Sequence, residues 1–300
     1  MKRICNRPIQ IDALTLCFAV INDYHYQKII DLDFGESYDL IEFKLTRVEG
    51  RYYNNVYNIS YWDGEKESEF GQLKFNICQG NISSNTHLNG AMKVWLSINN
   101  EMLYKSDFYN LDYIATTLGL ELHNITTLDL CLDTSYNISK RLKSLIRNKS
   151  VTTILNGKRI INRFEDRPEI TYTLSGSLDK DKYMTVNIKQ RKAIKDKSKG
   201  VTVITYDKVA EVKNSSDKEY ILSHYGYPKS LFRTEVHLNN EEIKDYFESN
   251  GIELTYWSFA NEVLLEQIFF YHLNSVIRFE QGKEHVLWQD ILGKQKLPRL

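Results

Sequence analysis

The stretch KSLFRTEVHLN, residues 229–239, alternates polar with apolar side chains and indicates how this part of the chain folds. A spacing of two residues is typical of a β-strand that buries one face. Glu235 then lies in a polar stripe, where a carboxylate needs an ion pair or a metal to be stable. Arg233 is its nearest cation, so a simple surface pair explains this pattern equally well. The two faces carry Leu231, Arg233, Glu235 and His237 on one side, and Phe232, Thr234, Val236 and Leu238 on the other.

Alternating runs of this kind fill the first hundred residues, separated by turns that carry Gly and Asn. From residue 240 onward the apolar spacing becomes that of helices. We therefore expect an α+β fold, with largely antiparallel sheets in two β-rich halves, short helices and a C-terminal helical segment. The expected parts are 1–122, 123–240 and 241–300.

Helix signals give the positions of several elements. A helix is expected to begin near Asn110, a plausible N-cap, and to end at Gly119. A long helix with an apolar face is expected at 257–279, and a short one around 285–292. Other expected elements are a helix at 138–148 and strands at 91–104, 125–135, 169–177 and 182–192.

Bulk composition limits the functional classes. Lys and Arg number 39 and Asp and Glu also number 39, so any nucleic-acid contact must come from a local basic patch. No apolar run reaches eighteen residues, and no signal peptide is recognised, so no membrane contact is expected. The four cysteines Cys5, Cys17, Cys78 and Cys131 form no C-x-x-C pair, which favours a reducing, cytoplasmic location.

Familiar catalytic motifs are missing from the sequence. It contains no G-x-x-x-x-G-K-[ST], no G-x-S-x-G and no H-E-x-x-H. An H-x-H metal pair, which one class of DNA-nicking enzymes uses, is also missing. Any chemistry must therefore come from acids on strand faces together with a tyrosine.

The stretch GVTVITYDKVAEV (200–212) ends a β-branched run on Tyr206 and adds Asp207, Lys208 and Glu211. A tyrosine at a strand end is most often a packed ring. With an ordinary pKa near 10, a phenol is a poor nucleophile at neutral pH. A cation such as Lys208, or a divalent metal, would stabilise the phenolate and make attack feasible. Tyr206 is thus either a packed ring with a wet hydroxyl or a nucleophile.

Two further acids lie on the expected strand at 125–135, where Asp129 and Asp133 share a face. Four strand residues span roughly 13 Å, so one ion cannot easily bind both carboxylates without a bulge. We expect one of them to be a metal ligand. The other would be structural, and Asp133 could cap the helix at 138–148.

Two basic runs flank these strands in the sequence. Charge runs usually mark solvated surface. Phosphate contacts from them would give salt-sensitive and mostly sequence-independent DNA binding. The runs contain Lys140, Arg141, Lys143, Arg147 and Lys149, then Lys189, Arg191, Lys192, Lys195, Lys197 and Lys199.

The order of four motifs resembles the rolling-circle replication initiation proteins and relaxases of the Rep_trans (replication initiation factor) type. These motifs are ITTLDLCLD, TYTLSGS, VTVITYDKVAEV and LFRTEVHL, and the resemblance covers about residues 9–240. In that family a tyrosine cuts one DNA strand, becomes linked to the 5′ phosphate and leaves a free 3′ hydroxyl. Such proteins start the replication or transfer of plasmids, phages and mobile elements, and a divalent ion assists.

The resemblance implies that Tyr206 is the nucleophile and that Lys208 acts beside it in catalysis. Mg or Mn would be the metal and single-stranded or hairpin origin DNA the substrate, with a host helicase and a second copy of the chain as further partners. The implied metal ligands are Asp129, Asp133, Glu211 and Glu235. With the basic runs, the expected DNA contacts are Lys140, Arg141, Lys189, Arg191, Lys192 and Arg233.

The sequence departs from the family pattern in two places. Thr127 stands where an arginine usually precedes the first Asp, and the segment that begins at Tyr172 is one residue longer. Tyr172 and Tyr183 therefore stay open as alternative nucleophiles. A DNA-binding regulator of the same fold that does not nick, or an assembly protein whose polar stripes are interface, are alternative functions.

Overall fold

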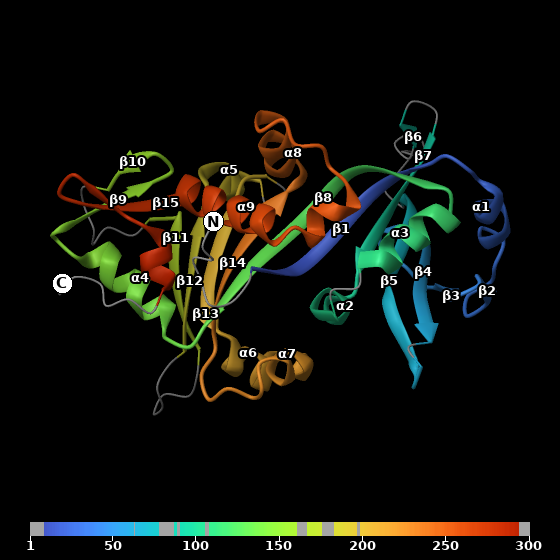
Figure 1. Ribbon diagram of the computed structural model, residues 1–300, viewed down its shortest axis with the longest axis horizontal. Coiled ribbons are helices and arrows are strands. Elements are labelled where there is room, and N and C mark those ends of the chain that lie inside the picture. Colours follow the sequence, from blue (N-terminus) through green and yellow to red (C-terminus); the bar gives the residue numbers. More distant parts are fainter. Residues whose placement is uncertain are drawn as a thin grey trace. The chain divides into compact units, whose positions relative to one another are not determined.

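The computed structural model describes residues 9–62, 64–77, 87–88, 91–105, 108–160, 167–175, 183–196 and 199–293. These residues form a large and a small sheet of mostly antiparallel strands together with helices, which confirms the expected α+β class (Figure 1). No helix within this part of the chain is long and apolar enough to cross a membrane.

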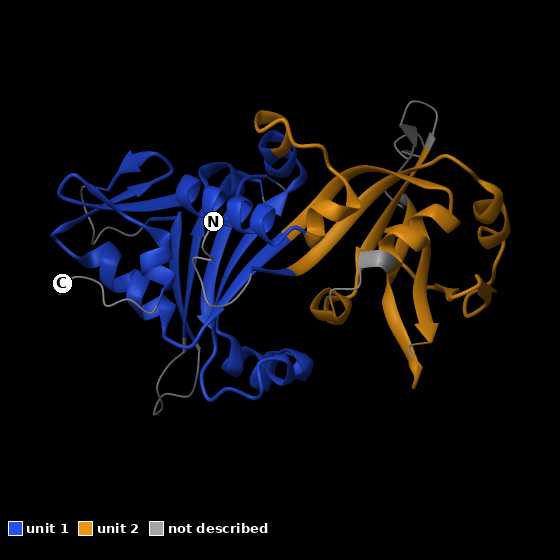
Figure 2. Cartoon of the chain, in the orientation of Figure 1, with its two compact units in different colours: residues 1–11, 129–246, 261–300 blue, residues 12–128, 247–260 orange. Residues whose placement is uncertain are grey.

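Two compact units make up the chain, and each is discontinuous in sequence (Figure 2). Unit 1 comprises residues 1–11, 129–246 and 261–300, and unit 2 comprises residues 12–128 and 247–260. The expected boundaries after residues 122 and 240 differ from this division. The strands at Gln10–Val20 and Leu120–Thr134 each begin in one unit and end in the other. Because the chain stays in a strand there, no change of composition marks these unit boundaries in the sequence.

Unit 2 is built on strands that follow the order β8-β1-β7-β5-β4-β3-β2. Phe43 lies at its core, with its ring centroid 5.8 Å from that of Phe70 and 5.7 Å from that of Tyr113. The strands are β1 (Gln10–Val20), β2 (Ser37–Asp39), β3 (Phe43–Val48), β4 (Tyr53–Trp62), β5 (Glu67–Ile77), β6 (His87–Leu88), β7 (Ala91–Ile98) and β8 (Leu120–Thr134). The helices are α1 (Tyr24–Ile29), α2 (Asn100–Lys105), α3 (Phe108–Thr117) and the 3-10 turn η2 (Tyr256–Ala260).

Unit 1 continues from the end of β8 in the order β14, β13, β12, β11. These strands are β11 (Ile170–Ser175), β12 (Tyr183–Lys189), β13 (Thr202–Asp207) and β14 (Phe232–Asn239). A small sheet contains β9 (Val151–Leu155), β10 (Lys158–Arg159), β15 (Ile277–Gln281) and β16 (Glu284–Val286). The helices are α4 (Ile138–Arg147), α5 (Arg191–Lys195), α6 (Lys208–Ser215), α7 (Glu219–His224), α8 (Asn240–Ser249), α9 (Glu262–Val276) and α10 (Trp288–Leu292).

The large sheet has a buried and a polar face in unit 1. Val203 and Thr205 on β13 are fully buried, and the Thr205 hydroxyl bonds to Ser139 of α4 at 2.9 Å. Helices α4 and α9 both contact β13 and β14, and α10 contacts both helices, so these helices cover one face. Residues that point the other way are partly or fully exposed, among them Thr171, Thr173, Thr185, Asn187, Thr202, Ile204 and Tyr206. We call this the polar face.

The helix predicted at 257–279 is shorter than expected. Asn261 caps α9 by accepting a hydrogen bond from the Leu264 amide at 3.1 Å, and the residues before it form η2. Ile277 and Phe279 instead belong to strand β15 of the small sheet, and both are buried. The C-terminal segment is therefore not a third part, because its main helix packs on the unit 1 sheet.

Two other local predictions can be compared with the structure. Helix α3 begins at Phe108, so Asn110 lies inside the helix and is not its N-cap. Gly119 follows the helix with φ +62°, as expected of a residue that ends a helix in the left-handed region. The segment expected to be strand at 91–104 is strand only to Ile98 and continues as α2.

Gly71 on β5 is required by a close approach of two strands. A Cβ at this position would collide with the carbonyl oxygen of Ser97 on β7. We predict that Gly71→Ala lowers the free energy of unfolding by about 1–3 kcal/mol, because the backbone must shift to relieve the overlap. Chemical denaturation would measure this, with Glu69→Ala on the exposed side of the same strand as control. Equal midpoints for Gly71→Ala and the wild type would contradict the prediction.

Candidate functional site

The Tyr206 hydroxyl lies between a carboxylate and an ammonium group on the polar face. It donates a hydrogen bond to Glu235 Oε1 at 2.5 Å and accepts one from Lys208 Nζ at 3.3 Å. Tyr206 lies opposite Arg233 in the β13–β14 pair, and Glu235 follows two residues later on the same face. Strand register therefore brings together a phenol, a proton acceptor and a cation.

Lys208 is held at the junction between β13 and α6. Asp207 caps α6 by accepting a hydrogen bond from the Ala210 amide at 2.9 Å, and the Lys208 amide donates to the Leu231 carbonyl at 2.8 Å. The Lys208 side chain is only 2% exposed, and its ammonium pairs with Glu211 Oε2 at 2.8 Å. A buried ammonium needs such partners to offset its lost hydration, so its position is fixed.

A buried ion pair lies beneath this cluster. Arg233 donates from Nε to Asp133 Oδ1 at 2.8 Å and from Nη2 to Oδ2 at 2.7 Å, and both side chains are fully buried. Its Nη1 lies 3.8 Å from Glu235 Oε1. Arg233 thus links an acid of β8 to the acid that accepts the hydrogen bond of the Tyr206 hydroxyl. Burial and the nearby Asp133 carboxylate raise the pKa of Tyr225.

A second acid–base pair lies further along the same face. His237 Nδ1 bonds to Asp129 Oδ1, with 37% of the His237 side chain and 23% of the Asp129 side chain exposed. The hydrogen bond to Asp129 raises the pKa of His237, and the Glu235 charge raises it further, against a lowering by burial. The polar face therefore carries a histidine that holds its proton more tightly than usual.

The four acids predicted as metal ligands have four different partners. Asp129 bonds to His237, Asp133 to Arg233, Glu211 to Lys208 and Glu235 to Tyr206. Among the described residues no three His, Cys, Asp or Glu side chains converge on a point that could hold an ion. Both oxygens of Asp133 are used by a buried guanidinium, so Asp133 is a structural acid. As these side chains lie, they do not fit a divalent metal.

Among the predicted DNA contacts, Lys189 lies on the polar face. It is partly exposed and faces Thr202, which in turn faces His237. Arg191 and Lys192 follow on α5 and form ion pairs with Glu169 at 3.1 Å and with Glu242 at 2.6 Å, so they are partly neutralised.

The remaining predicted DNA contacts are on the opposite face of the sheet or are buried. Helix α4 covers the opposite face of the sheet, and it carries both Lys140, which is exposed, and Arg141. Arg141 donates to the Asp290 carbonyl at 3.0 Å and lies over the Tyr136 ring, so it has a packing role. Arg233 is fully buried and cannot touch a phosphate in this arrangement, which corrects the prediction for that residue.

Tyr172, the alternative nucleophile, points to the other face of the sheet. It pairs with Val186, which pairs with Thr205, so it shares a face with α4 and not with Tyr206. Lys143 of α4 lies 5.4 Å from the centre of its ring, and burial raises the pKa of its hydroxyl. The side chain of Tyr183 lies outside the described residues.

Several contacts in this site were not expected from the sequence. His237 belongs to the same alternating stripe as Glu235, but nothing in the sequence connects it with Asp129, more than a hundred residues earlier. Tyr225 directly follows α7 and belongs to no sequence motif that would indicate a place near Asp133. Asp207 ends strand β13 and directly precedes helix α6. An Asp between a strand and a helix is a common N-cap, so the sequence did offer a signal for this contact.

Comparison with known proteins gives no assignment: no family model matches the chain, and no curated protein does so either. We therefore infer function from the contacts described above and from the resemblance in motif order.

Removing Asp133 should destabilise unit 1 strongly. We predict that Asp133→Ala lowers the free energy of unfolding by about 3–5 kcal/mol, because it leaves the Arg233 charge buried without a counterion. The double variant Asp133→Leu/Arg233→Met should recover much of this loss in a denaturant titration. Asp217→Ala, at an exposed position in the same unit, serves as control. A loss of less than 1 kcal/mol for Asp133→Ala would be inconsistent with a buried pair.

The Asp129–His237 pair should make stability depend on pH. The pKa of His237 is raised in the folded state, so the pair contributes its full stability below the ordinary histidine pKa of about 6.5. That contribution is lost as the pH rises through the folded-state pKa. Unfolding of the wild type and His237→Gln between about pH 5.5 and 8.5 should therefore show the largest difference at the acidic end. A difference that grows with pH would contradict this sign.

Proposed function

We propose that the protein cuts and rejoins DNA strands through a covalent bond between Tyr206 and a 5′ phosphate. The observation that carries the proposal is the Tyr206 hydroxyl, bonded to Glu235 and to the buried Lys208 on a face that is partly open to solvent. A tyrosine whose only task is packing does not need both a proton acceptor and a buried cation at its oxygen.

The chemistry requires one proton transfer and one displacement. Glu235 takes the phenolic proton as the Tyr206 oxygen attacks the phosphorus, and the ammonium of Lys208 stabilises the negative charge on that oxygen. The new bond joins the phosphorus to the tyrosine oxygen, and the bond from phosphorus to the 3′ oxygen breaks. The 3′ oxygen leaves as a hydroxyl with a proton that the protonated Glu235 passes to it through water, and its return attack rejoins the strand.

The substrate of this reaction would be single-stranded or hairpin DNA at the origin of a plasmid, phage or mobile element. Lys189 and the hydroxyl and amide groups of Thr202, Asn187 and Thr185 lie on the same face as Tyr206. Contacts of this kind bind the sugar-phosphate backbone without reading its sequence. A cytoplasmic location is part of the proposal, and the buried Cys17 and Cys131, neither of which forms a disulfide, are consistent with it. A host helicase and a second copy of the chain are proposed as further partners.

A requirement for Mg or Mn stays a prediction from the resemblance. The acids of the polar face are engaged with other side chains, so no step of the reaction is derived through an ion. The engagement of all four acids favours one second candidate, a regulator that binds DNA without nicking.

The proposal predicts a protein–DNA adduct that depends on Tyr206. The purified protein would be incubated with labelled single-stranded DNA from its own element, with Mn²⁺, with Mg²⁺ or with a chelator, and run on a denaturing gel. We expect an adduct with the wild type and none with Tyr206→Phe, which lacks the attacking oxygen. Glu235→Gln should slow its formation by about 10²–10⁴-fold because the proton acceptor is lost.

Tyr172→Phe is the matched control, since it removes a half-buried tyrosine hydroxyl from the opposite face of the same sheet. It should leave the adduct unchanged. An adduct that survives in Tyr206→Phe would show that Tyr206 is not the nucleophile. Salt-sensitive binding to cognate DNA without any adduct would favour the regulator.

A further inference from the structure

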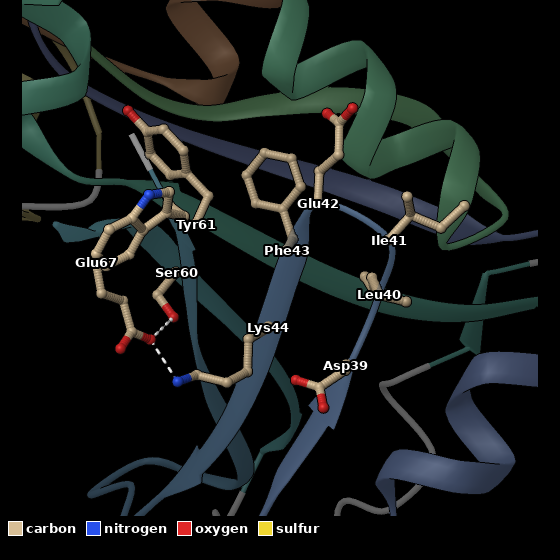
Figure 3. A pocket seen from close by; sticks show the side chains of 10 residues that line it. Asp39, Leu40, Ile41, Glu42, Phe43, Lys44, Ser60, Tyr61 and Glu67 are labelled. Atoms are coloured by element: carbon tan, nitrogen blue, oxygen red, sulfur yellow. Dashed lines mark hydrogen bonds and ion pairs between the residues drawn. The ribbon is translucent and has the colours of Figure 1, made fainter. Parts of the chain in front are cut away.

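Unit 2 carries an open groove at the ends of strands β2, β3 and β4, far along the chain from Tyr206 (Figure 3). Its volume is about 400 Å³, which is large enough for two or three side chains of a partner. The residues that line it are Asp39, Leu40, Ile41, Glu42, Phe43, Lys44, Ser60, Tyr61, Trp62 and Glu67.

The apolar part of the groove combines a rigid base with exposed rims. Phe43 is buried, and its ring centroid lies 5.6 Å from that of Tyr61, so these two rings form a fixed surface. Trp62 is 67% exposed and Ile41 is 94% exposed. Large apolar side chains gathered at a hollow are typical of surfaces that another molecule covers.

The charges of the groove favour a cationic occupant. Lys44 is bound by Glu67 at 2.5 Å, and Ser60 also donates to Glu67 at 2.6 Å, so this lysine is neutralised inside the groove. Asp39 and Glu42 are exposed and have no ion-pair partner among the described residues. Three carboxylates against one ammonium give the lining a formal charge of −2. This charge repels phosphate groups and attracts Arg or Lys.

From this combination we infer a docking site for a short segment of a partner protein that contains both basic and apolar residues. An arginine of that segment would stack its planar guanidinium on Trp62 and bond to Asp39 or Glu42. An apolar neighbour would cover Ile41. Strand β2 ends the strand order of the sheet, so its outer edge also offers backbone groups to an extended peptide. The site is independent of the chemistry proposed for Tyr206.

The test uses a fluorescein-labelled peptide of alternating arginine and leucine as a probe, with binding measured by fluorescence anisotropy. Trp62→Ala should weaken binding about tenfold, because the stacking surface is lost. Asp39→Asn/Glu42→Gln should weaken it by a similar factor and reduce its dependence on salt. A peptide with glutamate in place of arginine should not bind.

Matched controls separate the groove from general surface effects. Trp257→Ala removes another exposed tryptophan of unit 2, and Asp31→Asn/Asp33→Asn removes two exposed acids outside the groove. Both should bind the probe like the wild type, and Tyr206→Phe should do so as well. Equal binding by all variants would overturn the proposal. So would sedimentation showing a dimer that Trp62→Ala dissociates, because the occupant would then be a second copy of the chain.

Discussion

Arg233 and Asp133 hold opposite charges in a part of unit 1 that water does not reach. Removing both groups from water costs several kcal/mol for each ion, and only two parallel hydrogen bonds of good geometry offset that cost. The pair therefore fixes the spacing of β8 and β14 at this point. The same guanidinium also lies close to the Glu235 carboxylate and helps to position it. Glu235 in turn positions the Tyr206 hydroxyl through a hydrogen bond. The arrangement on the polar face thus depends on a pair that no ligand would touch.

The sequence was informative where a local pattern decides the structure. Alternation in residues 229–239 predicted a strand with Arg233, Glu235 and His237 on one side, and the strand is found there. Tyr206 and Glu235 were both proposed as site residues, but their contact depends on the register of two strands that are separated by two helices. A shift of one residue would turn one of them to the opposite face, and nothing in the sequence fixes that register.

Residue type alone does not indicate which partner each charged side chain has. The carboxylate type of the four acids predicts metal ligands, whereas Asp129, Asp133 and Glu235 each bond to a side chain from another segment, as Asp129 does to His237. Glu211 pairs with Lys208 on its own helix. The basic runs predict a surface for phosphate, whereas Lys192 pairs with Glu242 and Arg141 packs against the C-terminal region. The helix predicted at 257–279 is too long because Ile277 and Phe279 fit the apolar face of a helix as well as the buried face of a strand. Only their pairing with β9, which the sequence does not reveal, makes them part of a strand.

The discontinuity of the two units has a consequence for synthesis on the ribosome. Residues 12–128 are made early, but unit 2 gains its last piece, 247–260, only after β13 and β14 of unit 1 have been made. Strand β9 must wait for β15, which is made more than a hundred residues later. Neither unit can complete its core while the chain is partly made, so the nascent protein exposes apolar surface until late in translation.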